Sequence, residues 1–273
     1  MSQLEVRVAA RYGGPLPPGS LPDANAVLDQ LLGHRSVRAY LPQPLPPGTL
    51  ETIVAAAQSA STSSNLQAWS LVAVEDPARK ARLATLAANQ AHVRAAPLFL
   101  VWLADLARID RVAREQGEVA EGLQFLEALL VGVIDAALAA QNAVVALESL
   151  GLATVYIGAI RNRPEDVAAE LGLPPGVFPV FGMCVGYEDP ARPAQVKPRL
   201  PQGVVLHREQ YDLAAQLPLI HDYDAVLGRF WDSQGMQQPE WSRMAVNRVK
   251  TPASLHGRER LVEALRRLGF GLR

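Results

Sequence analysis

Apolar residues recur at two spacings along the chain, and together the spacings predict a protein of mixed helices and strands. Ile53, Val54 and Ala57 follow the helical interval of three to four residues. Residues 69–74 and 97–103 are short apolar runs bounded by turn residues, as buried strands are. Helices are expected at 23–33, 49–58, 78–88, 126–150, 164–171, 223–233 and 258–268. Strands are expected at 69–74, 97–103, 155–157 and 177–187.

The longest predicted helix, residues 126–150, is rich in alanine and leucine and apolar on nearly every side. A helix of that kind is buried, whereas a surface helix carries one apolar stripe. We therefore expect it at the centre of the protein or in an interface between subunits. We expect no membrane span, because its most apolar stretch is short and carries an acid, Asp135.

No linker rich in proline or glycine divides the chain into two cores. The expected organisation is one α+β domain with a central sheet of four or five strands and flanking helices. Within it, residues 1–22 are expected to form an irregular N-terminal arm because of their Pro/Gly content. Residues 23–210 would form the main domain, and residues 211–273 a helical C-terminal extension of it.

Composition excludes several classes of protein. The 273 residues include one cysteine, so neither an internal disulfide nor a cysteine-rich zinc site can form. With 26 basic against 27 acidic side chains, the surface as a whole would not attract nucleic acid or anionic lipid. The N-terminus carries no apolar signal core, and a cytoplasmic location is expected.

Common catalytic motifs are also absent. The sequence contains no Walker loop, no dinucleotide-binding glycine pattern and no nucleophile elbow. The five histidines lack the spacing of metal ligands. Cys184 lies among apolar residues, which favours a buried structural thiol over a nucleophile.

Four short segments could bind an anionic, flat ligand. His-Arg-Ser-Val-Arg at 34–38 and Lys-Pro-Arg at 197–199 offer donors that suit a phosphate. The hydroxyl-rich run 61–65 could hydrogen-bond a polar heterocycle, and Gly158 at the end of a strand would let the backbone approach a ring. Each segment alone also fits a solvated basic turn, an ordinary helix end or a buried strand. Together they suggest a phosphate-bearing, flat aromatic cofactor, and flavin mononucleotide (FMN) fits that description.

In the order of these segments, the sequence resembles the nitroreductase family, in particular its larger, NADPH-preferring bacterial nitroreductases and flavin reductases. The resemblance covers roughly residues 24–210. It rests on H-R-S-V-R at 34–38, S-T-S-S-N-L-Q at 61–67, N-Q-x-H-V at 89–93, A-Q-N-A at 140–143, E-S-L-G-L-x-x-V-Y-I-G at 148–158 and V-K-P-R-L-P at 196–201.

The resemblance implies the α+β nitroreductase fold, with a central antiparallel-type mixed sheet, and an obligate homodimer that binds FMN at the subunit interface. The long apolar helix would then pack against its counterpart. The residues that match the family's FMN-binding positions are His34, Arg35, Ser36, Arg38, Thr62, Ser63, Ser64, Gln90, Tyr156, Ile157, Gly158, Ala159, Lys197 and Arg199. Ser64 and Asn65 match the adjacent substrate pocket.

The implied activity is a ping-pong reduction in which NADPH, or alternatively NADH, reduces the flavin and an acceptor then reoxidises it in the same pocket. Nitroaromatics and quinones are the expected acceptors. No side chain is expected to act as an acid–base catalyst, and no metal, membrane or nucleic-acid partner is expected. The alternatives are a flavin reductase that supplies free reduced FMN, a non-catalytic flavin-binding protein and an oxygen-using flavin enzyme of the same superfamily.

Three positions depart from the family pattern. Gln234 stands where NADPH-preferring members place an arginine that binds the 2′-phosphate, which leaves the choice of nicotinamide cofactor open. Asn65 replaces a residue that is often aromatic and would make the pocket more polar. Ala159 replaces a common glycine. The N-terminal arm matches no part of the family that can be placed.

Overall fold

The structure is a computed structural model that describes residues 3–14, 21 and 23–273. The chain forms two compact units. Unit 1 comprises Met1–Arg35 and Gln195–Leu255, and unit 2 comprises Ser36–Ala194 and His256–Arg273. These units differ from the expected division at residues 22 and 210, because a segment in the second half of the chain groups with the N-terminus.

Unit 2 contains a four-stranded sheet in the order β1-β2-β4-β3. Every pair of neighbouring strands is antiparallel, so the sheet is antiparallel rather than mixed. The parallel pairing in this unit is an isolated bridge between Ser36 and Thr154. The strands are β1 (Trp69–Val74), β2 (Leu98–Asp105), β3 (Ala153–Ile157) and β4 (Val177–Gly186).

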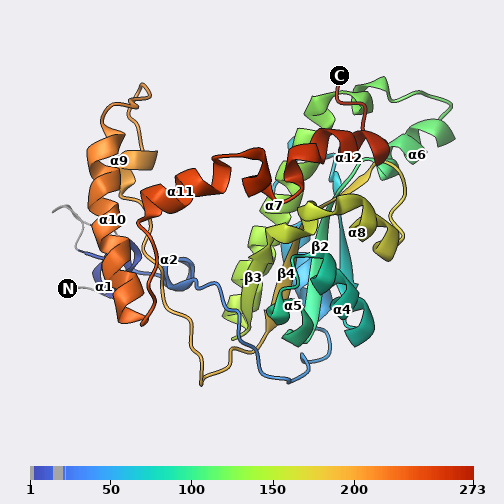
Figure 1. The fold of residues 1–273 in the computed structure, drawn as a ribbon. Helices are drawn as coiled ribbons and strands as arrows, with labels where there is room; N and C mark the ends of the chain where they lie inside the picture. Colours follow the sequence, from blue (N-terminus) through green and yellow to red (C-terminus); the bar gives the residue numbers. More distant parts are fainter. Residues whose placement is uncertain (1–2, 15–20, 22) are drawn as a thin grey trace. The chain divides into compact units, whose positions relative to one another are not determined.

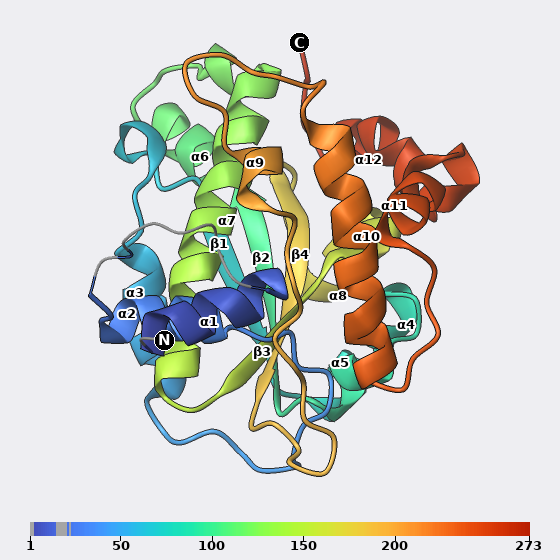
Figure 2. The ribbon, with the colours of Figure 1, turned by 90° about the vertical axis from the view of Figure 1, so that its left-hand side faces the viewer.

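Helices cover both faces of this sheet (Figures 1 and 2). They are α3 (Thr49–Gln58), α4 (Pro77–Leu86), α5 (Ala91–Ala95), α6 (Ala107–Glu115), α7 (Leu126–Ser149), α8 (Pro164–Leu171) and α12 (Leu261–Arg267). Short 3-10 turns lie between them, at Ser63–Asn65, Glu121–Gln124, Gly158–Asn162 and Arg258–Arg260.

Strand β2 is apolar without alternation because both of its faces are covered. Phe99 and Val101 point into the core that α4, α5 and α8 complete. Leu100 and Trp102, one position on in each case, point into the core made with α3 and α7. Since successive side chains of a strand face opposite sides, a strand between two helical layers needs apolar residues at every position.

Helix α7 is the long apolar helix that the sequence predicts, and one of its sides packs on the sheet through small residues. Ala136, Ala139 and Ala143 are fully buried. Among the described residues, α7 is the helix long and apolar enough to cross a membrane by length and composition, yet half of its most apolar window is buried inside the protein. The core that it covers therefore explains the apolar character of its buried side.

Gly132 allows α7 to approach the sheet closely. A Cβ at this position would lie 3.0 Å from the Cβ of Ala104 on β2 and 3.1 Å from the backbone oxygen of Ala68. A larger residue here would push the helix away from both. The contact therefore places the adjoining turn of α7 directly beside the chain that enters β1.

Unit 1 is helical. Its helices are α1 (Gln3–Tyr12), α2 (Ala26–Gly33), α9 (Gln202–Val205), α10 (Gln216–Ser233) and α11 (Trp241–Val249), with a 3-10 turn at Pro252–Leu255. Helix α1 lies in the segment expected to be irregular. It forms because Leu4 and Val8, one turn apart, are both buried, and because the glycines and prolines of this segment begin only at Gly13.

Candidate functional site

The hydroxyl-rich loop that precedes β1 has an unusual backbone. Ser64, Asn65 and Gln67 have φ angles of 50°, 55° and 49°, in the left-handed region. That region costs a residue other than glycine roughly 1–2 kcal/mol, although asparagine tolerates it better than most. The side chains of Ser63 and Ser64 are exposed, as are those of Asn65, Leu66 and Gln67. The loop therefore presents its side chains outward while its backbone is held in a costly conformation.

A carboxylate on α7 holds this loop from inside. Asp135 is 1% exposed, and its Oδ2 accepts hydrogen bonds from Thr62 Oγ1 at 2.6 Å and from the Ala68 backbone nitrogen at 3.0 Å. Its Oδ1 accepts a third from the Ser63 nitrogen at 3.2 Å. Thr62 Oγ1 in turn accepts from the Gln67 nitrogen at 2.9 Å. The resemblance did not identify Asp135, whose only visible signal in the sequence is an acid inside an apolar helix.

The end of β3 carries the second group of expected residues. Ile157 and Ala159 are buried, whereas Tyr156 is 37% exposed and stacks edge-on against Phe181 at 5.1 Å between ring centroids. Gly158 begins a 3-10 turn. A flat ligand can approach a glycine backbone here because no Cβ stands in the way.

Two guanidinium groups that the sequence did not single out lie beside this glycine. A Cβ on Gly158 would be 3.5 Å from Nη2 of Arg161 and 4.0 Å from Nη2 of Arg258. Arg161 also donates to the Val180 backbone oxygen, and Arg258 Nε donates to Asn162 Oδ1 at 2.8 Å. Both side chains are thus fixed next to the end of β3, where they add positive charge.

The second half of the H-R-S-V-R motif lies beside the same strand. Ser36 forms a bridge with Thr154 of β3, and the Val37 nitrogen donates to the Thr154 oxygen at 2.9 Å. Burial, with a smaller contribution from the positive charge of Arg38, lowers the pKa of His92. The Ser36 and Val37 part of the motif therefore lies beside β3 within unit 2. Gln90 is placed at the N-cap of α5, in the segment that also contains His92.

In unit 1, the other basic residues are brought together by Arg11. Its Nη2 donates to the backbone oxygens of Leu32 at 2.7 Å and His34 at 2.8 Å, and its Nη1 donates to the Lys197 oxygen at 3.1 Å. The Arg199 nitrogen donates back to the Arg11 oxygen at 2.9 Å. Residues that are far apart in the sequence thus meet around one buried guanidinium.

Lys197 and Arg199 both lie beside Arg11 in unit 1. The Lys197 ammonium sits 4.6 Å above the ring centre of Trp231, and Arg199 Nη1 donates to the Lys197 oxygen at 3.2 Å. His34 and Arg35 lie on the adjoining segment, so the backbone segments that carry these four basic residues are neighbours in unit 1. This set of donors suits a phosphate monoester. Arg11 was missed because its segment was expected to be irregular.

Each unit, taken by itself, therefore holds residues of the kinds that suit one part of FMN. Unit 1 provides a cationic donor cluster for a phosphate, and unit 2 provides an exposed hydroxyl-bearing loop and a glycine-terminated strand for a ring system. The division between the units falls within the H-R-S-V-R motif, between Arg35 and Ser36.

Other chemistries find less support in the described part of the chain. It contains no group of three or more histidine, cysteine, aspartate and glutamate side chains that could hold a metal ion. Cys184 is buried, burial raises the pKa of its thiol, and the sulfur lies 3.6 Å from the His92 backbone oxygen. A thiol in this state is a poor nucleophile, so the predicted structural role of Cys184 is supported.

Comparison with known proteins identifies the family of the chain. Residues 31–187 match the nitroreductase family, and residues 197–273 match the C-terminal domain of that family. An FMN reductase (NADPH) of Bacillus subtilis is 39% identical over 231 residues, which are 83% of this chain and 92% of the relative. An oxygen-insensitive NADPH nitroreductase of Salmonella typhimurium is 36% identical over 248 residues, or 90% of this chain and 98% of the relative.

Solved structures agree with the sequence matches. The NADPH:FMN oxidoreductase of Vibrio harveyi, in complex with NAD⁺, superposes with a TM-score of 0.80 at 34% identity and covers 91% of this chain and all of its own. The fold, the order of the motifs and two consecutive family matches lead to one conclusion. The chain belongs to the nitroreductase family.

Proposed function

We propose that the protein is an FMN-dependent NAD(P)H oxidoreductase that reduces nitroaromatics and quinones by two electrons. Relatives named as NADPH nitroreductase, FMN reductase and NADPH-flavin oxidoreductase match most of the chain. The observation that carries the proposal is the pair of donor sets described above: the cations around Arg11 in unit 1, and the loop and strand end in unit 2. Bound FMN would accept a hydride from NAD(P)H and pass two electrons to the acceptor.

The overall reaction is balanced without a metal or a covalent protein intermediate. One NAD(P)H and one proton convert a quinone to a hydroquinone, or a nitro group to a nitroso group and water, with release of NAD(P)⁺. The protein would bind and orient the partners in succession, and its cations would favour the anionic reduced flavin. No protein side chain is assigned as an acid or a base.

The residues proposed to hold the phosphate of FMN are Lys197 and Arg199 together with His34 and Arg35. Thr62, Ser63 and Ser64 are proposed to line the ring. The remaining contacts proposed for FMN are Ser36, Arg38, Gln90, Tyr156, Ile157, Gly158 and Ala159. Ser64 and Asn65 would also contact the electron acceptor, because both side chains are exposed on the loop.

A homodimer is part of the proposal, because α7 leaves one apolar stripe uncovered. Leu126, Leu130, Ile134 and Leu138 recur every four residues, and their exposed fractions lie between 44% and 53%. Residues at this spacing share one face of a helix, and an exposed apolar face of this kind marks an association surface. The opposite side of α7 is buried in the core, so the helix would serve both the fold and the interface.

The nicotinamide preference and the location of the protein are further predictions. Gln234 lies at the C-cap of α10 with its side chain exposed, and its Nε2 donates to Ser233 Oγ at 3.1 Å. An amide there can donate a hydrogen bond to a 2′-phosphate but lacks the positive charge and the bidentate geometry of an arginine. NADPH is proposed as a hydride donor, with NADH accepted as well. A cytoplasmic location is expected.

Anaerobic mixing of the flavin-loaded protein with NADPH or NADH in a stopped-flow instrument tests the proposed activity. We expect either nucleotide to bleach the flavin absorbance, and a nitrofuran or a quinone to restore it. Steady-state assays should give kcat/KM values for these acceptors that exceed the value for free FMN. A dominant kcat/KM for free FMN would identify a flavin reductase instead, whereas bound flavin that neither nucleotide bleaches would identify a non-catalytic flavin-binding protein.

Replacing Lys197 and Arg199 together with alanine tests the phosphate site. Each change removes a charge-assisted contact worth about 1.5–3 kcal/mol, so the dissociation constant for FMN should rise by about 100-fold or more. Titration of apoprotein with FMN, followed by flavin fluorescence, measures this constant. The matched control is the double variant Arg208→Ala and Lys250→Ala, which removes two exposed cations of unit 1 and should leave it unchanged. Unaltered FMN affinity in the first variant would refute the assignment.

Introducing a charge into the exposed stripe of α7 tests the dimer. Leu130→Lys places an ammonium in the proposed apolar interface, where its burial would cost several kcal/mol or force the subunits apart. Sedimentation velocity should show a dimer for the native protein and a monomer for this variant. Val119→Lys, at a highly exposed valine outside the stripe, should remain dimeric. A native protein that sediments as a monomer at micromolar concentration would contradict the proposal.

A further inference from the structure

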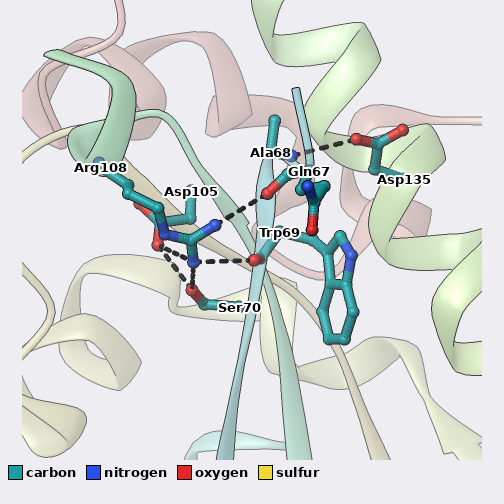
Figure 3. A network of polar contacts seen from close by, with 7 residues as sticks. All are labelled: Gln67, Ala68, Trp69, Ser70, Asp105, Arg108 and Asp135. Carbon is teal, nitrogen blue, oxygen red and sulfur yellow. Dashed lines mark hydrogen bonds and ion pairs between the residues drawn. The ribbon is translucent and has the colours of Figure 1, made fainter. Parts of the chain in front are cut away.

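The loop Thr62–Gln67 is held on two sides by groups of opposite charge. On one side, the Asp135 carboxylate accepts from Thr62 Oγ1 and from the backbone nitrogens of Ser63 and Ala68. On the other side, Arg108 Nη1 donates to the backbone oxygen of Gln67 at 2.8 Å, and its Nη2 donates to that of Trp69 at 3.1 Å. Figure 3 shows the carboxylate and the guanidinium on either side of this segment.

One peptide group connects the two charges. The carbonyl of Gln67 and the N–H of Ala68 belong to the same peptide unit, so Arg108 and Asp135 bind its opposite ends. A hydrogen bond with one ionised partner is about twice as strong as a neutral one, and the two polarise the peptide in the same direction. This arrangement stabilises the left-handed conformation of Gln67, which would otherwise be unfavourable.

Asp135 and Arg108, which together form a clamp on the loop, are themselves held in place by other residues. Arg108 Nη2 also donates to Ser70 Oγ at 2.6 Å and to Asp105 Oδ2 at 3.1 Å. The start of β1 and the end of β2 therefore orient the guanidinium group. Asp135 lies one helical turn beyond Gly132, whose missing Cβ brings α7 against Ala68. The clamp is thus built on regular elements, which can hold a loop more precisely than another loop could.

The clamp contacts do not involve the side chains of Ser64 and Asn65, which remain exposed. Of the loop residues, Thr62 is half-buried and bound to Asp135, while Ser64 and Asn65 are exposed. We propose that Asp135 and Arg108 are positioning residues, which hold Thr62–Gln67 in the conformation that lets Ser64 and Asn65 bind the electron acceptor. This proposal rests on the proposed function, because it assigns the loop to the acceptor pocket of an FMN enzyme.

The test compares an acceptor that must be oriented in the pocket, a quinone, with one that needs no pocket, ferricyanide. Flavin-loaded protein is reduced anaerobically with dithionite and mixed in a stopped-flow instrument with a quinone or with ferricyanide, a small outer-sphere oxidant. In Asp135→Asn, the amide nitrogen replaces one of the two carboxylate oxygens, so in either orientation it faces a backbone N–H, that of Ser63 or that of Ala68, with no acceptor to offer. The second-order rate constant for the quinone should therefore fall by about 10-fold or more, whereas that for ferricyanide should stay within about twofold.

Two further variants keep the test decisive. Glu51→Gln makes the same carboxylate-to-amide change at an exposed position on α3 and should behave as the native protein. Arg108→Met keeps the side-chain stem at a half-exposed position but removes the guanidinium, and should reproduce the selective loss with the quinone. If Asp135→Asn does not fold or does not retain FMN, the result with Arg108→Met decides.

The outcomes distinguish this inference from the proposed function. Native protein that binds no FMN, or whose reduced flavin is not oxidised by the quinone, would contradict the proposed function. Native protein that reacts as expected, together with variants whose quinone rate constants equal the native value, would overturn the positioning role alone. An equal fall for quinone and ferricyanide would also overturn it, because the change would then act on the flavin rather than on acceptor binding.

Discussion

The geometry of the candidate site depends on the three hydrogen bonds that the Asp135 carboxylate accepts inside the core of unit 2. A carboxylate buried to this extent would be strongly destabilising without partners, and here the partners come from one loop. The loop needs the carboxylate in return, because three of its residues adopt left-handed backbone conformations. The buried carboxylate and the left-handed loop would each be unfavourable alone, and each compensates for the cost of the other.

Helix α7 links this interaction to the rest of the molecule. Its small buried residues let it lie close against β2, and Asp135 reaches the loop from the same side. Its exposed stripe, which includes Ile134 next to Asp135 in the sequence, is the surface proposed for dimerisation. One helix would therefore carry the core, the acceptor loop and the subunit interface, which explains why it is apolar nearly all round yet keeps one acid.

Sequence patterns predicted the elements that packing determines most strongly. The strands Trp69–Val74 and Val177–Gly186 and the helices α7 and α8 appear within a residue or two of their expected ends, because their apolar runs or capping signals are unambiguous. Helices α6 and α11, of nine residues each, were missed: none of their residues is fully buried, although Ile109 of α6 packs against the core. The basic segments were visible as candidates, but the grouping of residues 34 and 197 around Arg11 depends on contacts between distant residues. The role of Asp135 was invisible for the same reason, because its partners lie about 70 residues earlier in the chain.

Hydrogen–deuterium exchange over residues 62–68 tests the central claim that a buried carboxylate holds the acceptor loop. The backbone N–H groups of Ser63 and Ala68 donate to Asp135, and that of Gln67 donates to the threonine hydroxyl that Asp135 accepts from. We expect these amides to exchange slowly in the native protein and much faster in Asp135→Asn, while the amides of β2 keep their protection. Equal exchange of the loop amides in the two proteins would contradict the account.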